Sequence, residues 1–401
     1  MGNAEGNEAV RPQALAARAG EDGFRPPGQI VLVLQGGGAL GAYHAGVFEA
    51  LHEAGIEPDW VIGTSIGAIN AALIAGNPPA RRLARLREFW RLVEWRDAFG
   101  FAAAVPSWLA GPFANFDTLV RGVSGFFDFN PYALFGVGAP LGLDHAAFYR
   151  TMPLRATLAR LVDFDLLEHG PMRVTVGAVN ARTGAMRYFD SRSETLTAEH
   201  MLASGALPPA FAAVRIDGEP YWDGGIYSNT PIEAVLDDNP RRSSTVFNVH
   251  LWNPNGSEPQ SIWEVLGRQK EIQYSSRSDS HVNRQRQLHR LRHVINTLAL
   301  HVPEDKRRDQ AVRELLSWGC STTIHVVRLL APRLEGEDHT KDIDFTPRGI
   351  RERWTAGYAD TQDAIARRPW LCEVDPLEGI VLHDHESKMG SDTNYEVRNG
   401  Q

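Results

Sequence analysis

Trp60-Val61-Ile62-Gly63-Thr64-Ser65-Ile66-Gly67 leads from an apolar run, through a glycine-flanked serine, into the small-residue stretch Ala68 to Ala75. The apolar run predicts a short buried strand, and the small-residue stretch predicts a helix. Between them, Gly63 to Gly67 fits G-x-S-x-G, the pattern of a nucleophile elbow, in which a serine occupies a strained turn between strand and helix. A glycine-serine turn without catalytic meaning is the alternative, because short motifs also match by chance.

A similar unit precedes this one. Ile30 to Leu34 predicts a buried strand, a glycine cluster follows, and Ala42 to Ala54 predicts a helix. Two strand–loop–helix units in succession indicate an α/β protein with a mostly parallel sheet covered by helices. Further strands are expected in four segments, and the last two indicate that the sheet continues past residue 240: Met172 to Val179, Met186 to Phe189, Thr245 to Trp252 and Thr322 to Leu330.

Composition restricts the class of protein. The chain has 401 residues, of which 43% are hydrophobic and 22% charged, and this balance is typical of a globular protein with a substantial core. A formal net charge of -8 gives no general reason to expect nucleic-acid binding. The two cysteines, Cys320 and Cys372, lack the C-x-x-C spacing of a zinc or redox site, so we expect reduced structural thiols and neither a metal nor a cofactor.

The sequence also bears on location. Residues 1 to 20 are polar and lack the apolar core of a secretory signal, and no uninterrupted apolar stretch reaches the roughly 18 residues of a spanning helix. We therefore expect a cytoplasmic protein whose contact with a membrane, if it has one, is peripheral. Oligomeric state leaves no signal in the sequence.

The glycine cluster Gly36-Gly37-Gly38-Ala39-Leu40-Gly41 admits two interpretations. It contains G-x-G-x-x-G after a strand and before a helix, which is the loop of a nucleotide-binding oxidoreductase. In that fold an acidic residue should close the second strand, whereas Asp59 precedes it and Ser65 follows it. The favoured interpretation is an oxyanion hole, because consecutive glycines leave backbone N–H groups unobstructed.

Asp223 is the candidate base. It begins Asp223-Gly224-Gly225, after the expected hairpin at Asp217-Gly218 and before Asn229-Thr230-Pro231, an expected helix start. A turn aspartate without chemistry is the alternative, because Asp-Gly pairs are common in turns.

These glycine-flanked elements, in the order oxyanion loop, serine, aspartate, together resemble the patatin-like phospholipase family, and the resemblance extends from about Val31 to Leu236. It implies a three-layer α/β/α fold, a lipid or acyl-ester substrate, and a Ser65–Asp223 dyad that works without histidine. The oxyanion hole would comprise Gly36, Gly37, Gly38 and Ile66, and the other motif positions are Gly41, Gly63, Gly67, Gly224 and Gly225. Family members often carry Lys or Arg where this chain has Leu40. The substitution removes a positive charge near the oxyanion loop, so the substrate preference is expected to differ from that of such members.

A complete Ser-His-Asp triad is a further alternative, because Ser, Asp, His is the chain order of α/β-hydrolases. His250 and His325, in or near predicted strands after Asp223, are the candidates. A nucleotide-binding oxidoreductase and a catalytically silent lipid-binding protein remain the alternatives to an acyl hydrolase.

Two segments are candidates for lipid contact. The aromatic-rich insertion near 99–143 has the composition of an acyl-chain pocket or bilayer contact, or of an inserted core subdomain. Between Asp279 and Glu304, arginines alternate with Leu288, Leu291, Ile295 and Leu298, which predicts a helix with one apolar and one basic face. A surface helix with solvated arginines is the plainer interpretation.

The expected organisation has four parts: a flexible leader at 1–28, a catalytic domain at 29–240, a C-terminal extension at 241–380 that completes the sheet and adds helices, and a flexible tail at 381–401.

Overall fold

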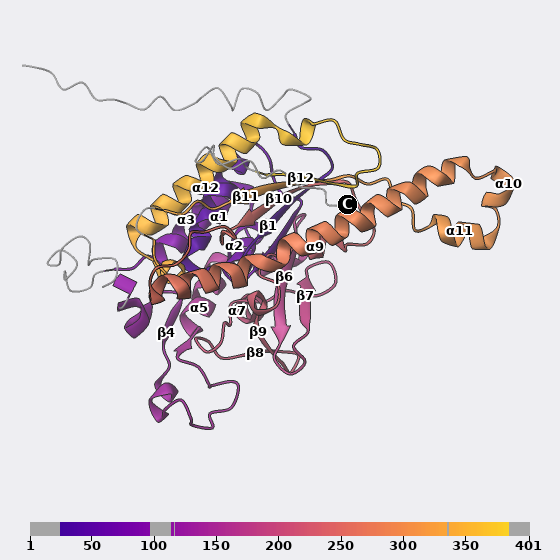
Figure 1. Ribbon diagram of the computed structural model, residues 1–401. Helices are drawn as coiled ribbons and strands as arrows, with labels where there is room; N and C mark the ends of the chain where they lie inside the picture. Colours follow the sequence, from indigo (N-terminus) through magenta and orange to yellow (C-terminus); the bar gives the residue numbers. More distant parts are fainter. Residues whose placement is uncertain (1–24, 97–113, 116, 335–336, 385–401) are drawn as a thin grey trace, which may run out of the picture.

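The computed structural model describes residues 25–96, 114–115, 117–334 and 337–384, and a large sheet lies at its centre (Figure 1). Within these residues the sheet has nine strands in the order β12-β11-β10-β1-β2-β6-β9-β8, with β7 paired to β6. The strands from β12 to β6 are parallel, and the pairs formed by β7, β8 and β9 are antiparallel. The strand bounds are β1 Gln29–Leu34, β2 Trp60–Thr64, β6 Arg173–Asn180, β7 Met186–Asp190, β8 Val214–Ile216, β9 Glu219–Asp223, β10 Ser244–His250, β11 Ile324–Leu330 and β12 Ile380–His383.

The central strands are apolar on both faces because helices cover both faces. Along β1, Ile30, Leu32 and Leu34 belong to one core cluster, whereas Val31 and Val33 belong to the other. Alternate residues of a strand point to opposite faces, so a continuous apolar run fits a strand buried on both sides. The expected three-layer α/β/α architecture with a mostly parallel sheet is confirmed.

One helical layer packs on the face of Ile30 and Leu32, and the other on the face of Val31 and Val33. The first layer contains α1 Ala42–Glu53, α2 Ile66–Ala75, α3 Pro79–Leu92 and α12 Pro347–Arg367; the second contains α8 Glu233–Leu236 and part of α9 Ile262–His301. Helix α12 lies close against α1, because a Cβ at Gly46 would meet the Trp354 carbonyl at 1.9 Å. The C-terminal part of the chain is thus packed on the first helix.

A smaller antiparallel sheet follows α3 and belongs to the aromatic-rich insertion. Its strands are β3 Gly122–Val123, β4 Phe127–Phe129 and β5 Tyr149–Arg150, with the short 3-10 helix η4 Pro131–Phe135 between the last two. The chain returns to the main sheet through α5 Met152–Leu161 and α6 Phe164–His169, and α7 Ala198–Ser204 lies between β7 and β8. Of the aromatic residues in this insertion, Phe101, Trp108, Phe113 and Phe116 lie outside the described residues.

After residue 240 the chain adds three strands to the same sheet. Strand β12 includes residues 381–383, which the sequence analysis assigned to a flexible tail. They are ordered into a strand because they pair in parallel with β11, in the register His325↔Val381 and Val327↔His383. Residues 1–24 of the expected leader and 385–401 of the expected tail lie outside the described residues.

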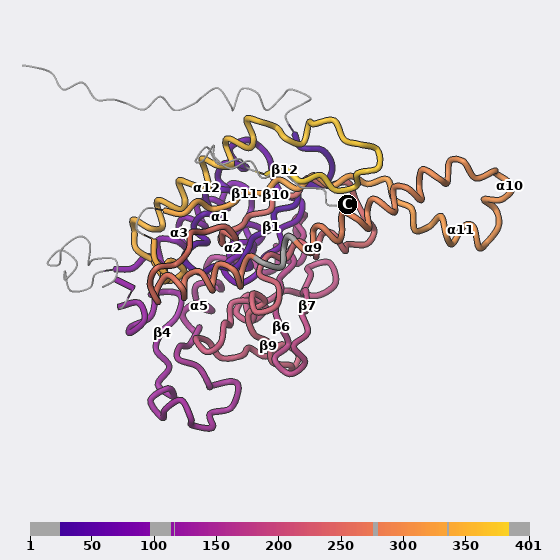
Figure 2. Tube along the Cα trace, in the orientation of Figure 1, coloured from indigo at the N-terminus to yellow at the C-terminus, as the bar shows by residue number. Residues whose placement is uncertain are grey.

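Helix α9 has 40 residues and extends well beyond the sheet (Figures 1 and 2). At its far end follow α10 Glu304–Arg307 and α11 Gln310–Leu316, and these form a projecting arm with the end of α9. Among the described residues, no helix combines the length and the apolar character needed to cross a membrane.

The apolar face expected on α9 is not the buried one. Leu288, Leu291 and Leu298 are exposed, whereas His289 and His293 are buried. The ring nitrogens of His293 lie 2.9 Å from the carbonyl oxygens of Pro376 and Thr322. Hydrogen bonds to these loops orient the histidine face inward, and the leucines are left on the surface.

Candidate active site

Ser65 stands between β2 and α2 in a conformation that non-glycine residues rarely adopt, with φ 57° and ψ -124°. Such a backbone costs of order 1–3 kcal/mol and persists only where the surroundings enforce it. Glycine is required on either side of Ser65 because a side chain there would collide with the backbone. A Cβ at Gly63 would lie 2.3 Å from the Gly67 backbone, and one at Gly67 would lie 2.2 Å from the Leu34 carbonyl oxygen. The turn is therefore a nucleophile elbow in its geometry as well as in its sequence.

Ser204, the last residue of α7, fixes this turn from behind. Its hydroxyl accepts the Ser65 backbone N–H at 2.9 Å and donates to the Gly177 carbonyl oxygen of β6 at 2.6 Å. Ser204 is fully buried, so the interaction is shielded from water. A single serine hydroxyl thus ties the elbow to the neighbouring strand. No local motif around Ser204 marks it in the sequence.

Asp223 lies at the end of β9, where it pairs with Ala178 of β6 and is 3% exposed. Its Oδ1 accepts the Gly225 backbone N–H at 2.7 Å, and the Ser65 side chain lies close enough to the carboxylate to affect its pKa. Burial raises the pKa of Asp223 to about 7, against the opposing effects of the Gly225 N–H and the Ser65 side chain. The predicted serine and aspartate are therefore neighbours, and the carboxylate has the proton affinity that a base needs near neutral pH.

Gly36 anchors the glycine loop. Its N–H donates to the Asn229 carbonyl oxygen at 3.1 Å, and its own carbonyl accepts from Asn229 Nδ2 at 3.0 Å and from Trp252 Nε1 at 2.8 Å. The sequence analysis expected Gly36 to donate to an oxyanion. In the structure its N–H is engaged, because a segment almost 200 residues away folds back onto the loop.

The other expected donors start helices. Gly37 and Gly38 open the 3-10 helix η2 Gly38–Gly41, and Ile66 is the first residue of α2. First-turn N–H groups have no acceptor inside their own helix and point out of its N-terminus. The loop also lies against the serine, because a Cβ at Gly36 would come within 3.1 Å of Ser65 Cβ. Three of the four expected donors thus lie at helix starts, where backbone N–H groups lack an acceptor within their own helix.

Gln35 and Tyr274 join this loop to the C-terminal part of the chain. Gln35 Nε2 donates to Thr230 Oγ1 at 2.6 Å and to the Tyr274 carbonyl of α9 at 3.1 Å. Its Oε1 accepts from the backbone N–H groups of Leu251 and Trp252. Burial and then the charge of Asp223 raise the pKa of the Tyr274 hydroxyl to about 12. The sequence did not mark Gln35 or Tyr274, since their roles depend on contacts between distant segments.

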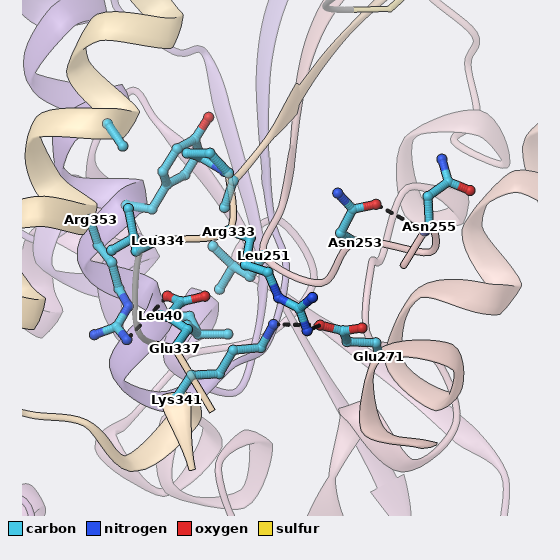
Figure 3. Close-up of a pocket in the computed structure, with 14 residues that line it drawn as sticks. Leu40, Leu251, Asn253, Asn255, Glu271, Arg333, Leu334, Glu337, Lys341 and Arg353 are labelled. Carbon is cyan, nitrogen blue, oxygen red and sulfur yellow. Dashed lines mark hydrogen bonds and ion pairs between the residues drawn. The ribbon is translucent and has the colours of Figure 1, made fainter. Parts of the chain in front are cut away.

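A cavity of about 130 Å³ lies beside the loop at Leu40 (Figure 3). Lys341, of the 3-10 helix η6 Lys341–Ile343, lines it and pairs with Glu271 of α9 at 2.8 Å. Arg353 of α12 also lines it and pairs with Glu337 at 3.4 Å. The family resemblance leads one to expect a cation at position 40; in this chain Lys341 and Arg353 line the same cavity as Leu40, each paired with a glutamate.

The candidate histidines of a triad lie elsewhere. His250 Nε2 lies 2.9 Å from Asn248 Nδ2, and burial together with Arg328 lowers the pKa of His250 to about 3. His325 is on β11, which β10 and β1 separate from β2, and its Nδ1 lies 3.0 Å from His383 Nε2. Neither histidine has Ser65 or Asp223 as its hydrogen-bond partner.

The geometry also argues against the dinucleotide interpretation of the loop. Asp59 precedes β2, and its Oδ2 accepts the Ile30 backbone N–H at 2.8 Å. It therefore stands at the amino end of the strands, at the opposite end from the glycine loop. The residue that follows the carboxyl end of β2 is Ser65.

Fold and site together define an α/β protein with a serine at a nucleophile elbow and a buried aspartate as its partner. Residues 32–236 match the family model described as patatin-like phospholipase, and residues 272–377 match a second model, described as patatin phospholipase. The first match covers just over half of the chain, so this protein belongs to the patatin-like phospholipase family. The family resemblance seen in the sequence is confirmed.

The aligned segments cover only a small part of the relatives' lengths. Patatin-like phospholipase domain-containing protein 6 of Homo sapiens is 49% identical over 61 residues, which cover 15% of this chain and 4% of the human protein. Lysophospholipase nte1 of Aspergillus fumigatus is 30% identical over 253 residues, which cover 59% of this chain and 14% of the fungal protein. Among solved structures, VipD from Legionella pneumophila has 15% identity and a TM-score of 0.37, with 85% of this chain and 67% of that chain covered.

Proposed function

We propose that this protein is a serine acyl hydrolase that cleaves lipid acyl esters, with Ser65 as nucleophile and Asp223 as general base. The observation that carries the proposal is the position of the elbow serine beside a buried carboxylate, which is 3% exposed and has its pKa raised to about 7. Ordinary aspartates, with a pKa of about 3.9, are weak bases at neutral pH. Desolvation raises the pKa of Asp223 into the range of an effective base, and the carboxylate lies near the Ser65 side chain from which it would accept the proton.

In the acylation step, Ser65 Oγ attacks the ester carbonyl carbon while its proton passes to Asp223. The N–H groups of Gly37, Gly38 and Ile66 hold the negative oxygen of the tetrahedral intermediate. The intermediate collapses, and the alcohol leaves with the proton from Asp223. In deacylation, water attacks the acyl-serine and gives its proton to Asp223, and the proton returns to Ser65 as the fatty acid leaves.

A short segment connects Asp223 to aromatic residues of the insertion. The backbone N–H of Asp223 donates to the Ala206 carbonyl oxygen at 3.0 Å, and the segment that follows Ala206 carries Phe211. The Phe211 ring lies 5.4 Å from Phe127 and 6.1 Å from Tyr149, both of the small sheet. We propose that this aromatic cluster contacts the acyl chain, because long apolar chains bind in apolar, aromatic-lined sites.

The insertion also carries an exposed apolar tip. Leu134 is 78% exposed, Phe135 72% and Val137 93%. Large side chains that are exposed together typically mark a binding surface. We propose that this tip makes peripheral contact with a lipid surface and brings the substrate to Ser65.

The test is hydrolysis of p-nitrophenyl esters of graded chain length, together with labelling by a fluorophosphonate. Ser65→Ala should lose both activity and labelling, and Asp223→Asn should lose activity by at least about 10³-fold, as expected when the base of a coupled unit is removed. Asp217→Asn and Ser193→Ala are matched controls at surface turns and should resemble the wild type. Lipid binding without turnover or labelling in the wild type would instead favour a catalytically silent lipid-binding protein.

A further inference from the structure

Three potential metal ligands meet at the β12 edge of the sheet. His325 is on β11 and His383 ends β12, two residues beyond Val381, which is the register partner of His325. In adjacent strands, positions related in this way lie on the same face of the sheet. Cys372 follows the 3-10 helix η7 Pro369–Leu371, where the chain returns from α12. This group lies three strands away from β2 and takes no part in the proposed hydrolysis.

Side-chain positions bring these residues into ligand range. One ligand atom from each of His325, Cys372 and His383 lies within 4.8 Å of the other two. His325 Nδ1 and His383 Nε2 are 3.0 Å apart, and the two rings are stacked with an interplanar angle of 8°. Such separations approach those between ligands that share one metal ion, for which metal–nitrogen bonds are about 2.0 Å and metal–sulfur bonds about 2.3 Å.

We propose that His325, Cys372 and His383 form a binding site for a divalent transition metal, with Zn²⁺ as the expected occupant. Two imidazoles and a thiolate are ligands that zinc prefers, whereas Mg²⁺ and Ca²⁺ prefer oxygen. The Cys372 thiol loses its proton to solvent when the metal–sulfur bond forms. Three protein ligands leave a fourth tetrahedral position for water, on the side where Cys372 is exposed.

The surroundings of the two histidines also suit a metal. His325 is buried and His383 is half-buried, so solvent reaches the proposed site mainly on the side of the exposed Cys372. The carboxylate of Asp384 adds negative charge next to His383 and lies 3.4 Å from Arg328.

Bound metal would join three parts of the chain. Strand β12 is at the edge of the sheet and pairs with β11 alone among the described strands. A metal bound to both His325 and His383 would cross-link β11 and β12. A further bond to Cys372 would link the segment after α12 to these two strands. A ligand that binds only the folded state stabilises it, so zinc should raise the melting temperature.

The first experiment uses the tag-free full chain, stripped with a chelator and titrated with Zn²⁺ against a chromophoric competitor. We expect one zinc per chain. Cys372→Ser and His383→Gln should each weaken binding by roughly tenfold or more, because loss of even an outer-shell partner weakens metal sites by 10–100-fold. Cys320→Ser and His169→Gln are matched controls and should bind as the wild type does.

Co²⁺ provides a second readout that does not depend on activity. The wild type should show the thiolate-to-cobalt charge-transfer band, and Cys372→Ser should lose it while its circular dichroism and the fluorophosphonate labelling of Ser65 stay unchanged. Ser65→Ala should bind zinc normally, so failure of the proposed hydrolase leaves this test intact. Absence of saturable zinc binding, or a charge-transfer band that persists in Cys372→Ser, would overturn the proposal.

Discussion

At the scale of single residues, the ionisation of Asp223 should control activity. The base must be ionised to accept the Ser65 proton, and burial raises the pKa of Asp223 to about 7. For a soluble ester, kcat/KM should therefore rise with pH and reach half its maximum near pH 7, because this parameter reports ionisations of the free enzyme. A pH–rate profile measures this directly, and a plateau that continues down to pH 5 would contradict the assignment.

The same carboxylate should destabilise the fold at high pH. The pKa of Asp223 is raised from 3.8 to about 7 on folding, so the folded state favours the protonated form. The associated stability is fully present below pH 3.8 and is lost as the pH rises to about 7. At 1.36 kcal/mol per pKa unit, the loss is at most about 4 kcal/mol.

Asp223→Asn should therefore raise the free energy of unfolding at pH 8, by about 1–4 kcal/mol within that limit. The gain should shrink as the pH falls toward 4, where Asp223 is protonated in the folded wild type. Urea unfolding at pH 5 and pH 8 tests this, with the exposed Asp217→Asn as control. A variant that is less stable than the wild type at pH 8 would show that the carboxylate has some other favourable partner.

Sequence reasoning paired Ser65 with Asp223 because each lies in a short, glycine-flanked motif, and the structure places the two side chains near each other. It misjudged Gly36, since the acceptor of its N–H is the Asn229 carbonyl, far away in the chain. It also dismissed Cys372 from the spacing of cysteines. The partners of Cys372 are histidines on two strands, and only the folded sheet brings them together.

At the scale of elements, the contact between η2 and η6 should be sensitive to one added methyl group. Gly38 has φ 55°, and a Cβ there would lie 2.3 Å from the Asp342 carbonyl oxygen. Gly184 has φ 69°, but a Cβ there would meet nothing within 4 Å. Gly184→Ala should cost only the backbone strain, roughly 1–2 kcal/mol, with activity retained.

Gly38→Ala should cost more than that strain and should also lower kcat, because η2 must move away from η6 and take its N–H groups with it. Thermal unfolding and ester hydrolysis of the two variants, measured side by side, separate strain from displacement. Equal effects on kcat would mean that the position of η2 does not matter for catalysis.

Periodicity predicted elements well where local pattern and tertiary context agree. The strands β1 and β2 and the helices α1 and α2 lie where their apolar runs predict them. The buried face of α9 was not predicted, because hydrogen bonds from His293 to two loops outweigh the burial of its leucines. Strand β12 was missed because four residues next to a polar end carry little pattern.

At the scale of the whole molecule, two apolar projections are candidates for the surface that contacts lipid. The insertion tip carries Leu134 and Phe135, and the arm carries Leu298 and Leu300, which are 58% and 72% exposed. If the tip docks on lipid, Leu134→Ser with Phe135→Ser should reduce hydrolysis of vesicle substrate several-fold and leave hydrolysis of a soluble short-chain ester unchanged. Burying a leucine or phenylalanine side chain contributes about 1.5–3 kcal/mol, so the loss should be measurable.

Leu298→Ser with Leu300→Ser is the matched pair on the arm. Sedimentation with anionic vesicles, measured for both pairs, identifies the surface that adsorbs. A loss confined to the arm variant would move the lipid contact from the insertion to α9.

The length of α9 has a mechanical consequence. At 1.5 Å per residue, the helix measures about 60 Å, of which about 40 Å lies beyond Tyr274. Near its short end, the Tyr274 carbonyl holds Gln35 and Asn229, and Asn229 in turn holds Gly36. His289 and His293 are buried farther along the same helix. One continuous helix therefore connects α10 and α11 to the residues that hold the glycine loop, so a displacement of the arm would be transmitted along α9 toward Gly36.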